Sequence, residues 1–256
     1  MTILASIPLP LQPGDLAKLA PCAASAYFLD VDGTLLEIQP RPEDVAADAT
    51  LLRLIAELAA AVQGALALVS GRRLADIDRI FAPLTFCASG LHGAEIRFPD
   101  GSRRSGNCRA MDDVRPKVSE FIADHPGLRL EDKGAALALH FRQVPGLGQN
   151  VLEFLYPLAQ MNGLAVQEGK MVAELKEAQH DKAKAIGALL ETATFYGRMP
   201  VTIGDDLTDE CGFLFVNAQG GISVRAGAPG NASAARYSLP DPAAVRTELC
   251  KLLQSR

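Results

Sequence analysis

Several features are missing from this 256-residue sequence, and each absence narrows the class of protein. No uninterrupted apolar run approaches the ~20 residues that a helix needs to cross a bilayer, so we expect no membrane span. The chain has five cysteines but no Cys-x-x-Cys pair, which predicts reduced thiols in a reducing compartment. The first residues lack a basic segment and are interrupted by prolines, so we expect no signal peptide and a cytoplasmic protein.

Positive charge is also scarce. Lysine and arginine number 25 against 30 aspartates and glutamates, which gives a net charge of −5 and a pI near 5.4. A general nucleic-acid binder needs a basic surface to displace counterions from phosphates, so we exclude that class. Hydrophobic residues make up 48% of the chain and can supply a buried core, whereas the charged fraction of 21% is too low for disorder. At this length we expect one large domain, or a core with a smaller inserted domain.

Short, continuously apolar segments alternate with helix-periodic segments near both ends of the chain. Such runs are typical of strands buried on both faces of a parallel sheet. The alternation predicts an α/β fold with a doubly wound, mostly parallel, Rossmann-like core. The predicted strands are 25–30, 65–69, 85–88, 200–204 and 221–225, and the predicted helices are 48–63, 74–81, 182–190, 209–216 and one beginning at Asp241-Pro242.

The middle of the chain breaks this rhythm. A hairpin is predicted over 95–104, and an α+β segment with the order αββαββ follows it. We therefore predict a discontinuous core, 1–106 and 177–256, and an inserted cap domain, 107–176. The predicted cap helices are 112–124 and 149–161, and its predicted strands are 128–131, 136–143, 164–167 and 171–176.

Polar and apolar side chains alternate along two of the predicted cap strands. His140 and Arg142 share one face of the strand 136–143, and Glu174 and Lys176 share one face of another strand. Charged groups on the face opposite the apolar one can form a polar roof over a ligand. The cap is therefore predicted to bind a polar small molecule.

Oxygen-bearing side chains follow three of the predicted core strands. Asp30 and Asp32 come after the first, Ser70 after the second, and Asp205 and Asp206 after a strand much later in the chain. In open α/β sheets, ligands bind just beyond the carboxyl ends of the strands. We therefore expect these side chains to converge on one crevice.

Carboxylates this close together cannot all ionise without a cation. Carboxylate and carbonyl ligands without thiols or paired histidines favour Mg²⁺. An EF-hand calcium loop would also explain Asp-x-Asp-Gly, but it needs glycine at position 6 and glutamate at position 12. Leu35 and Arg41 occupy those positions, so we exclude it.

Phosphoryl transfer is the chemistry that this set of groups can perform. It needs an in-line nucleophile, neutralisation of the phosphoryl oxygens and a proton donor for the leaving oxygen. Asp30 is the predicted nucleophile, forming an aspartyl-phosphate, and Asp32 is the predicted acid and base. Thr34 and Ser70 are predicted to donate hydrogen bonds to the phosphate. Lys182, at the start of a predicted helix, is predicted to hold Asp30 and the phosphate together.

The order of these motifs resembles that of the haloacid dehalogenase superfamily. The matching segments are Asp30-Val-Asp-Gly-Thr-Leu35, Ser70-Gly71-Arg72, Lys182 and Gly204-Asp-Asp-Leu-Thr-Asp-Glu210. The αββαββ insertion is similar to the large cap of that superfamily's sugar-phosphatase branch. From about residue 25 to 252 the chain resembles, more narrowly, the trehalose-6-phosphate phosphatases. This narrower likeness also depends on Gly90-Leu-His-Gly-Ala-Glu95, Leu130-Glu-Asp-Lys133, Leu139-His-Phe-Arg142 and Ala173-Glu-Leu-Lys176.

The resemblance implies hydrolysis of trehalose 6-phosphate to trehalose and phosphate. It implies that Asp30, the carbonyl of Asp32, and Asp205 bind Mg²⁺, and we expect Asp206 and Asp209 to support these ligands from the second layer. The expected catalytic residues are Asp30, Asp32 and Lys182. The expected substrate-binding residues are Thr34, Ser70, Gly71, Arg72 and His92 in the core, and Glu131, Lys133, Arg142 and Glu174 in the cap, which would grip the sugar hydroxyls.

Two departures from the family pattern leave alternatives open. Lys176-Glu177 stands where the family usually has Arg-Pro, and Ala183 stands where it has glycine after the motif lysine. Lys184 is therefore an alternative to Lys182. Other possible functions are a phosphatase for sucrose 6-phosphate or mannosyl-3-phosphoglycerate, a sugar phosphomutase, or a receiver-like phosphoacceptor domain. The expected partner is a small sugar phosphate, and we expect a monomer.

Overall fold

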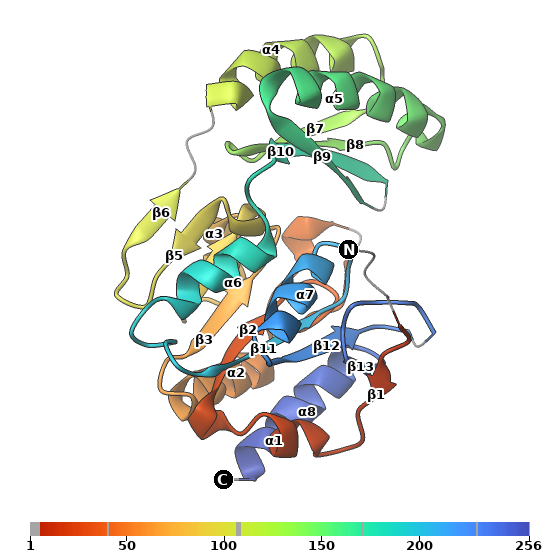
Figure 1. Cartoon of the computed structure of the whole chain (residues 1–256). Coiled ribbons are helices and arrows are strands. Elements are labelled where there is room, and N and C mark those ends of the chain that lie inside the picture. Colours follow the sequence, from red (N-terminus) through yellow and green to blue (C-terminus); the bar gives the residue numbers. More distant parts are fainter. Residues whose placement is uncertain (1–5, 40, 106–108, 170, 229, 256) are drawn as a thin grey trace. The chain divides into compact units, whose positions relative to one another are not determined.

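The continuously apolar segments form the centre of a nine-stranded sheet in the computed structural model (Figure 1). The structure describes residues 6–255 except 40, 106–108, 170 and 229. The sheet lies in the first of two units, Met1–Arg104 with Asp181–Arg256. Its strands follow the order β1 (Leu9–Pro10), β13 (Tyr237–Leu239), β12 (Ile222–Ala226), β11 (Met199–Gly204), β2 (Ser25–Leu29), β3 (Leu66–Val69), β4 (Cys87–Gly90), β5 (Glu95–Arg97) and β6 (Arg103–Ser105).

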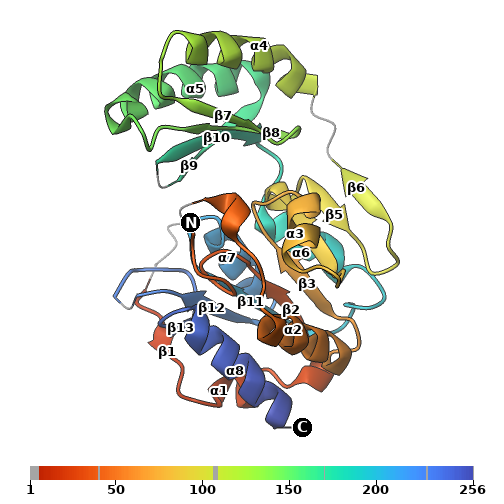
Figure 2. The same ribbon diagram turned by 180° about the vertical axis from the view of Figure 1, so that it is seen from behind.

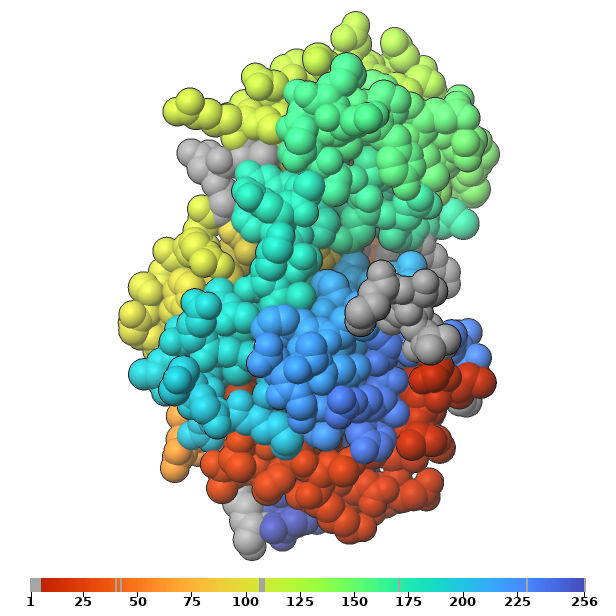
Figure 3. All heavy atoms as spheres, viewed as in Figure 1, coloured from red at the N-terminus to blue at the C-terminus, as the bar shows by residue number. Residues whose placement is uncertain are grey.

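The strands from β1 to β4 in this order are parallel, and β5 runs antiparallel to β4. Every residue of β2 and β3 is buried, because helices cover both faces of the sheet. Helices α6 (Lys182–Leu190) and α7 (Glu210–Ala218) pack together on one face, and their atoms hide the central strands in the space-filling view (Figure 3). Helices α2 (Ala49–Ala61) and α8 (Pro242–Gln254) pack together on the other face, seen in Figure 2. Helices α3 (Leu74–Ile80) and α1 (Asp15–Leu19) complete this unit.

The predicted doubly wound, mostly parallel α/β core is confirmed. Strands β1 and β13 were missed, because they have only two and three residues and no apolar run to mark them. The predicted start of the last helix is right: Asp241 Oδ1 accepts a hydrogen bond from the Ala244 N–H at 2.8 Å, and Pro242 occupies the first turn.

The second unit, Ser105–His180, contains the predicted insertion 107–176. Its elements occur in the predicted order αββαββ, and its four strands are antiparallel in the order β7-β8-β10-β9. Leu137, Leu139 and Leu175 of the sheet pack in one apolar cluster with residues of both helices. The elements are α4 (Arg109–Ala123), β7 (Arg129–Asp132), β8 (Ala136–His140), α5 (Gly148–Asn162), β9 (Leu164–Gly169) and β10 (Val172–Glu177).

The end of β8 differs from the prediction. The strand was expected to reach residue 143, but it stops at His140. The Phe141 N–H donates to Met171 O at 3.0 Å, and the Val144 N–H then donates back to Phe141 O at 3.0 Å, so the chain turns. Arg142 is therefore an exposed turn residue, and its predicted place beside His140 on one strand face is wrong.

Two further expectations concern the chain as a whole. Within the described residues, no helix is both long enough and apolar enough to cross a membrane. Cys22, Cys87, Cys211 and Cys250 are free thiols, and Cys108 lies outside the described residues.

Candidate active site

Asp30 lies just beyond the carboxyl end of β2, at the centre of the large sheet. Its N–H donates to Ile203 O at 2.9 Å, so pairing with β11 continues up to this residue. The side chain is only 6% exposed, and its Oδ1 accepts a hydrogen bond from Lys182 Nζ at 2.9 Å. Burial raises the pKa of Asp30, and the ammonium group of Lys182 opposes this rise without cancelling it.

Lys182 is the first residue of α6, and its side chain is 3% exposed. Nζ also donates to Asp209 Oδ1 at 2.7 Å, so it bridges two buried carboxylates. Burial alone would lower the pKa of Lys182, but the charges of Asp209 and Asp30 outweigh it and raise the pKa, so the group stays protonated. The side chain of Lys184 is 60% exposed and lies 4.0 Å from Asp181. The structure thus places Lys182, and not Lys184, against Asp30.

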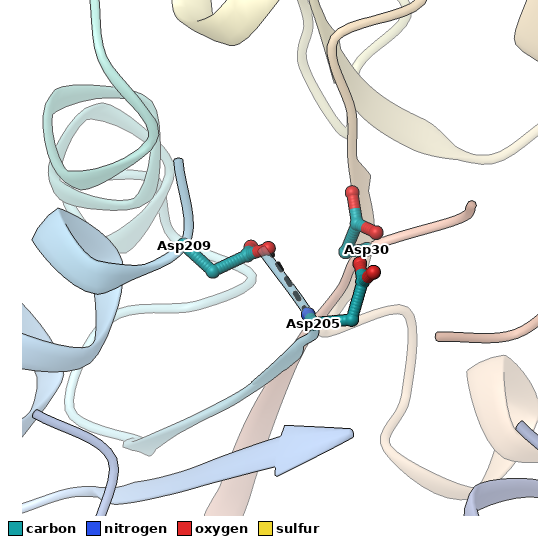
Figure 4. Close-up of side chains that lie close together, drawn as sticks. All are labelled: Asp30, Asp205 and Asp209. Atoms are coloured by element: carbon teal, nitrogen blue, oxygen red, sulfur yellow. Dashed lines mark hydrogen bonds between the residues drawn. The ribbon is translucent and has the colours of Figure 1, made fainter. Parts of the chain in front are cut away.

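Three carboxylates meet between the ends of β2 and β11 and the start of α7. One oxygen each of Asp30, Asp205 and Asp209 lies within 4.8 Å of the others (Figure 4). Asp209 Oδ2 accepts the N–H of Asp205 at 3.2 Å, drawn as a dashed line, and that of Asp206 at 3.3 Å. Because its other oxygen binds Lys182, Asp209 holds both the lysine and the acidic loop in place.

The charges in this cluster are crowded. Burial, with the nearby charges of Asp30 and Asp206, raises the pKa of Asp205 to about 8. Burial also raises the pKa of Asp209. It would likewise raise the pKa of Asp206, but the Lys182 charge and hydrogen bonds from the Thr208 hydroxyl and N–H reverse the direction and lower it. A carboxylate cluster of this kind fits a hard divalent cation, so it is a candidate metal site.

Two glycines let the backbone approach these carboxylates. A Cβ on Gly33, where φ is +78°, would lie 2.1 Å from Asp205 Oδ2, and one on Gly204 would lie 2.1 Å from Asp209 Cγ. Thr34, predicted to donate to a phosphate, is fully buried, and its hydroxyl donates to Asp205 Oδ1 at 3.5 Å. Its contact in the structure is therefore with the acidic cluster, and a phosphate contact stays a prediction.

The side chain of Asp32 lies outside this cluster and is held by Arg72. Arg72 Nε donates to Asp32 Oδ2 at 2.6 Å, and Nη2 donates to Oδ1 at 2.7 Å. Ser70, which is almost fully buried, accepts the Arg72 N–H on its hydroxyl at 3.1 Å. The pair was not predicted: the motifs indicate that both side chains lie near one sheet edge, but not that they bind each other.

His92 was predicted to contact substrate, and it lies buried in the short helix η3 (Leu91–Gly93) directly after β4. Its ring packs against Gly71, where an added Cβ would lie 2.6 Å from two ring atoms. The structure thus brings His92 to the Ser70-Gly71-Arg72 loop, and its contact with substrate stays a prediction.

Two of the candidate sugar-binding residues of the second unit, Glu131 and Glu174, share one face of its sheet. Glu131 on β7 and Glu174 on β10 both pair with Ala138 of the central strand β8, so the three side chains share one face. Lys133 Nζ donates to Glu174 Oε2 at 2.7 Å, and His140 Nε2 lies 3.0 Å from Glu131 Oε2. The carboxylates thus flank a small residue, and each has a basic neighbour.

Strand register adds a residue that sequence reasoning missed. Gln167 on β9 pairs with Glu174 and extends the row of Glu131, Ala138 and Glu174 across the whole sheet. This face lies opposite the one that packs Leu137 and Leu139 against the helices, because neighbouring residues of a strand point to opposite faces. Gln167 could have been predicted as a member of this row only if the strand register were known.

Comparison with known proteins identifies the family. The sequence profile of the Trehalose-phosphatase family matches residues 28–243. The trehalose-6-phosphate phosphatase of Escherichia coli K12 is 41% identical over 80% of this chain and 78% of its own. The probable trehalose-phosphate phosphatase of Sinorhizobium fredii is 41% identical over 86% and 84%. A solved structure of a trehalose-6-phosphate phosphatase related protein, 28% identical, matches with a TM-score of 0.76 over 90% of this chain and 97% of the other. The chain belongs to the trehalose-phosphatase family.

Proposed function

We propose that this protein is a magnesium-dependent phosphatase that hydrolyses trehalose 6-phosphate to trehalose and inorganic phosphate. The observation that carries the proposal is the buried contact between Lys182 Nζ and Asp30 Oδ1, next to the carboxylates of Asp205 and Asp209. This contact supports the proposal, because the carboxylate proposed as nucleophile, a buried positive charge and a candidate cation site lie together. The sugar comes from the substrate named for the Escherichia coli relative.

In this proposal an oxygen of Asp30 attacks the phosphorus in line with the bond to the sugar oxygen. That bond breaks, Asp32 gives its proton to the leaving oxygen, and an aspartyl-phosphate remains. Asp32 then takes a proton from a water molecule, which attacks the phosphorus and releases inorganic phosphate and free Asp30. Lys182 keeps Asp30 oriented through both steps and offsets negative charge at the phosphoryl group.

The proposed metal is Mg²⁺, held by Asp30, the carbonyl oxygen of Asp32, and Asp205, with Asp206 and Asp209 behind them. The raised pKa of Asp205 supports a cation here, because a cation relieves the repulsion that disfavours ionisation. When bound, Mg²⁺ would neutralise charge on the phosphoryl oxygens. Asp209 keeps the supporting role, because its oxygens already bind Lys182 and the loop N–H groups.

The remaining site residues divide between the two units. Thr34, Ser70 and Gly71 are proposed to lie at the phosphate, and the second unit is proposed as a cap that selects the sugar. For Arg72 and His92, predicted to bind substrate, the contacts of the Ser70-Gly71-Arg72 loop favour a different role. Glu131, Lys133, Arg142 and Glu174 are proposed to bind sugar hydroxyls, and the enzyme is proposed to be a cytoplasmic monomer.

Phosphate release from a panel of sugar phosphates, with Mg²⁺ and with excess EDTA, tests this function. We expect kcat/KM for trehalose 6-phosphate to exceed that for glucose 6-phosphate, sucrose 6-phosphate and mannosyl-3-phosphoglycerate by at least about tenfold, and to vanish with EDTA. Equal rates for trehalose 6-phosphate and glucose 6-phosphate would remove the sugar assignment. An isomeric sugar phosphate as product would indicate a mutase, and a lasting phosphoryl-Asp30 without turnover would indicate a receiver.

A further inference from the structure

Two consecutive residues after β4 have a backbone conformation that side chains disfavour. Leu91 has a φ of +48° and His92 a φ of +53°, and neither is a glycine or an asparagine. Left-handed conformations are costly for L-residues and persist where the surrounding structure enforces them, often at functional sites. The turn therefore calls for a physical reason.

The turn hydrogen-bonds the loop that carries Arg72. The Leu91 N–H donates to Arg72 O at 2.9 Å, and the His92 N–H donates to Ser70 O at 3.2 Å. Inside the loop, the Arg72 N–H donates to the Ser70 hydroxyl at 3.1 Å. Both ends of Ser70-Gly71-Arg72 are thus tied to the two left-handed residues through backbone groups.

The loop and the turn also pack closely against each other at two glycines. A Cβ on Gly71 would lie 2.6 Å from the His92 ring, and a Cβ on Gly90 would lie 2.6 Å from Arg72 O. A side chain at either position would collide with these atoms, so both positions require glycine. The loop and the turn are therefore in close contact at Gly71 and at Gly90.

The same segment reaches two neighbouring elements. Glu95 Oε2 accepts the Leu74 N–H at 2.8 Å and so caps the start of α3, which follows Arg72 by two residues. A Cβ on Gly93, where φ is +107°, would lie 2.7 Å from the carbonyl oxygen of Asp181, the residue before Lys182. Residues 91–95 thus lie between the arginine loop and the helix that begins at the lysine.

Arg72 uses its position to fix Asp32. Its guanidinium donates to both carboxylate oxygens, at 2.6 and 2.7 Å, and its side chain is only 13% exposed. A two-point contact between planar groups fixes the plane of the carboxylate as well as its position. A single-point contact or a lysine at this position would leave the carboxylate free to rotate.

We propose that Arg72 is a positioning residue for the acid/base Asp32, and that the left-handed turn at Leu91–His92 holds Arg72 in place. The inference deepens the proposed function and rests on it, because Asp32 must transfer protons in that reaction. Arg72 then acts on proton transfer and not on phosphate affinity. His92 contributes through the backbone of its turn and not through a contact with substrate.

The first experiment compares Arg72→Ala and Arg72→Lys with the control Arg73→Ala. Arg73 is the next residue along the chain, and it pairs with Asp76. On the best sugar phosphate we expect both Arg72 variants to lose about 10²-fold in kcat while KM changes less than about threefold. Arg72→Lys keeps the charge but not the fork, so it separates positioning from charge. A risen KM with kcat retained, or full activity of Arg72→Lys, would overturn the inference. Thermal melting of each variant checks that it is folded.

A rapid-mixing experiment with p-nitrophenyl phosphate measures a burst of nitrophenolate. A purely structural role of Arg72 would not change the balance between this burst and the steady rate. Nitrophenolate leaves without a proton donor, so Asp30 is still phosphorylated, but hydrolysis of the aspartyl-phosphate still needs Asp32 as a base. We expect Arg72→Ala to release about one equivalent of nitrophenolate in a burst, followed by a steady rate about 10²-fold below that of the wild type. Loss of the burst together with the steady rate would assign Arg72 to phosphate binding. Where aryl-ester turnover is too slow to follow, the split between kcat and KM decides alone.

A second pair of variants tests the turn. Asparagine tolerates a positive φ, whereas the β-branched valine does not. We expect His92→Asn to keep kcat within about fivefold of the wild type and His92→Val to match the loss and the burst of Arg72→Ala. Equal losses for both would assign the effect to the ring and overturn the part given to the turn. If His92→Val fails to fold, Glu95→Ala weakens the same segment and is expected to give a smaller loss of the same kind.

These outcomes can be told apart from failure of the proposed function. The burst uses no sugar, so it tests the positioning of Asp32 even if trehalose 6-phosphate proves a poor substrate. Full activity in Asp30→Asn would remove the proposed chemistry and the inference together. Activity lost in Asp30→Asn but unchanged in Arg72→Ala would remove the inference alone.

Discussion

The two polar clusters of this chain are held together in different ways. Around Asp30, Lys182 and Asp209, the groups are almost fully buried, and each takes part in a hydrogen bond that joins distant parts of the sequence. On the sheet of the second unit, Glu131 and Glu174 are placed by strand register and flank one alanine. The first cluster depends on where parallel strands end, and the second on which residues of antiparallel strands stand opposite each other.

In the proposed function, this difference would separate chemistry from selectivity. Buried charges need compensation, and in the core cluster Lys182 supplies it for Asp30 and Asp209, so removing the lysine leaves both carboxylates uncompensated. On the sheet face, the partly exposed Glu131–His140 pair can change at modest cost, whereas Glu174 is buried against Lys133. Substitutions in the core cluster should therefore damage catalysis or stability broadly, and those on the sheet face should alter the response to one substrate.

The largest effect is expected for Asp30→Asn. It removes the proposed nucleophile, so we expect a loss of at least about 10³-fold in kcat on every phosphate ester, while the fold persists. The metal-free variant should melt no lower than the wild type, because one charge leaves a crowded cluster. Phosphate release and thermal melting measure both effects. Activity above about a tenth of the wild type would rule out Asp30 as the nucleophile, since losing an activated nucleophile costs far more.

Lys182→Met should follow closely, and Lys184→Met is its matched control. Removing Lys182 leaves Asp30 and Asp209 buried without a cation, so we expect about 3–5 kcal/mol of lost stability and a loss of about 10²–10³-fold in kcat. Lys184 is exposed, so its variant should stay within about 0.5 kcal/mol of the wild type. Chemical denaturation and steady-state kinetics make the comparison. Equal effects of the two substitutions would contradict the assignment.

The core cluster was largely predictable from the sequence. The apolar runs before Asp30 and Asp205 indicate buried parallel strands, and topology alone brings their carboxyl ends together. The helix Lys182–Leu190 begins and ends at the predicted residues, because Asp181 caps it and its apolar spacing is regular. The departure at Ala183 does not displace the lysine, since helical geometry places the side chain whatever small residue follows.

The contacts that remained hidden depend on angles and registers, which residue types do not encode. The Arg72–Asp32 pair could be predicted only if the direction of the turn that carries Arg72 were known. The left-handed conformation of Leu91 and His92 could not be predicted, because neither residue is a glycine. The position of Arg142 was predicted wrongly, because the alternation of polar and apolar residues does not show where the last hydrogen bond between the strands forms. The row through Gln167 requires the pairing of four strands at once.

The next prediction concerns that sheet face. For Glu174→Gln we expect kcat/KM for trehalose 6-phosphate to fall by about 10–100-fold, because the proposed hydrogen bond to a sugar hydroxyl would weaken, while turnover of p-nitrophenyl phosphate is unaffected. Glu168→Gln is the control, because Glu168 accepts a hydrogen bond from Tyr156 of α5 on the helix-covered side of the sheet. This variant should leave kcat/KM for both substrates unchanged. A parallel loss on both substrates would place Glu174 in the chemistry and blur the division between the clusters.

The smallest expected effect is a pH dependence of stabilisation by Mg²⁺. The pKa of Asp205 is about 8 in the folded protein and 3.8 in its ordinary state, so between these values the folded protein binds more protons than the unfolded chain. The free energy of unfolding of the metal-free protein therefore falls as pH rises through this window. The raised pKa values of Asp30 and Asp209 act in the same direction, whereas Lys182 stays charged throughout.

Mg²⁺ binds ionised carboxylates. Below pH 8 its binding must therefore displace a proton from Asp205, whereas above pH 8 Asp205 is already ionised. We expect the Mg²⁺-induced rise in Tm to be roughly 2–5 °C larger at pH 8.5 than at pH 6. Melting curves at matched ionic strength, with NaCl in place of the magnesium salt, isolate the specific effect. Asp205→Asn should abolish the rise at both pH values. An equal rise at both in the wild type would mean that Asp205 is already ionised at pH 6, and that crowding in the core cluster is weaker than its burial implies.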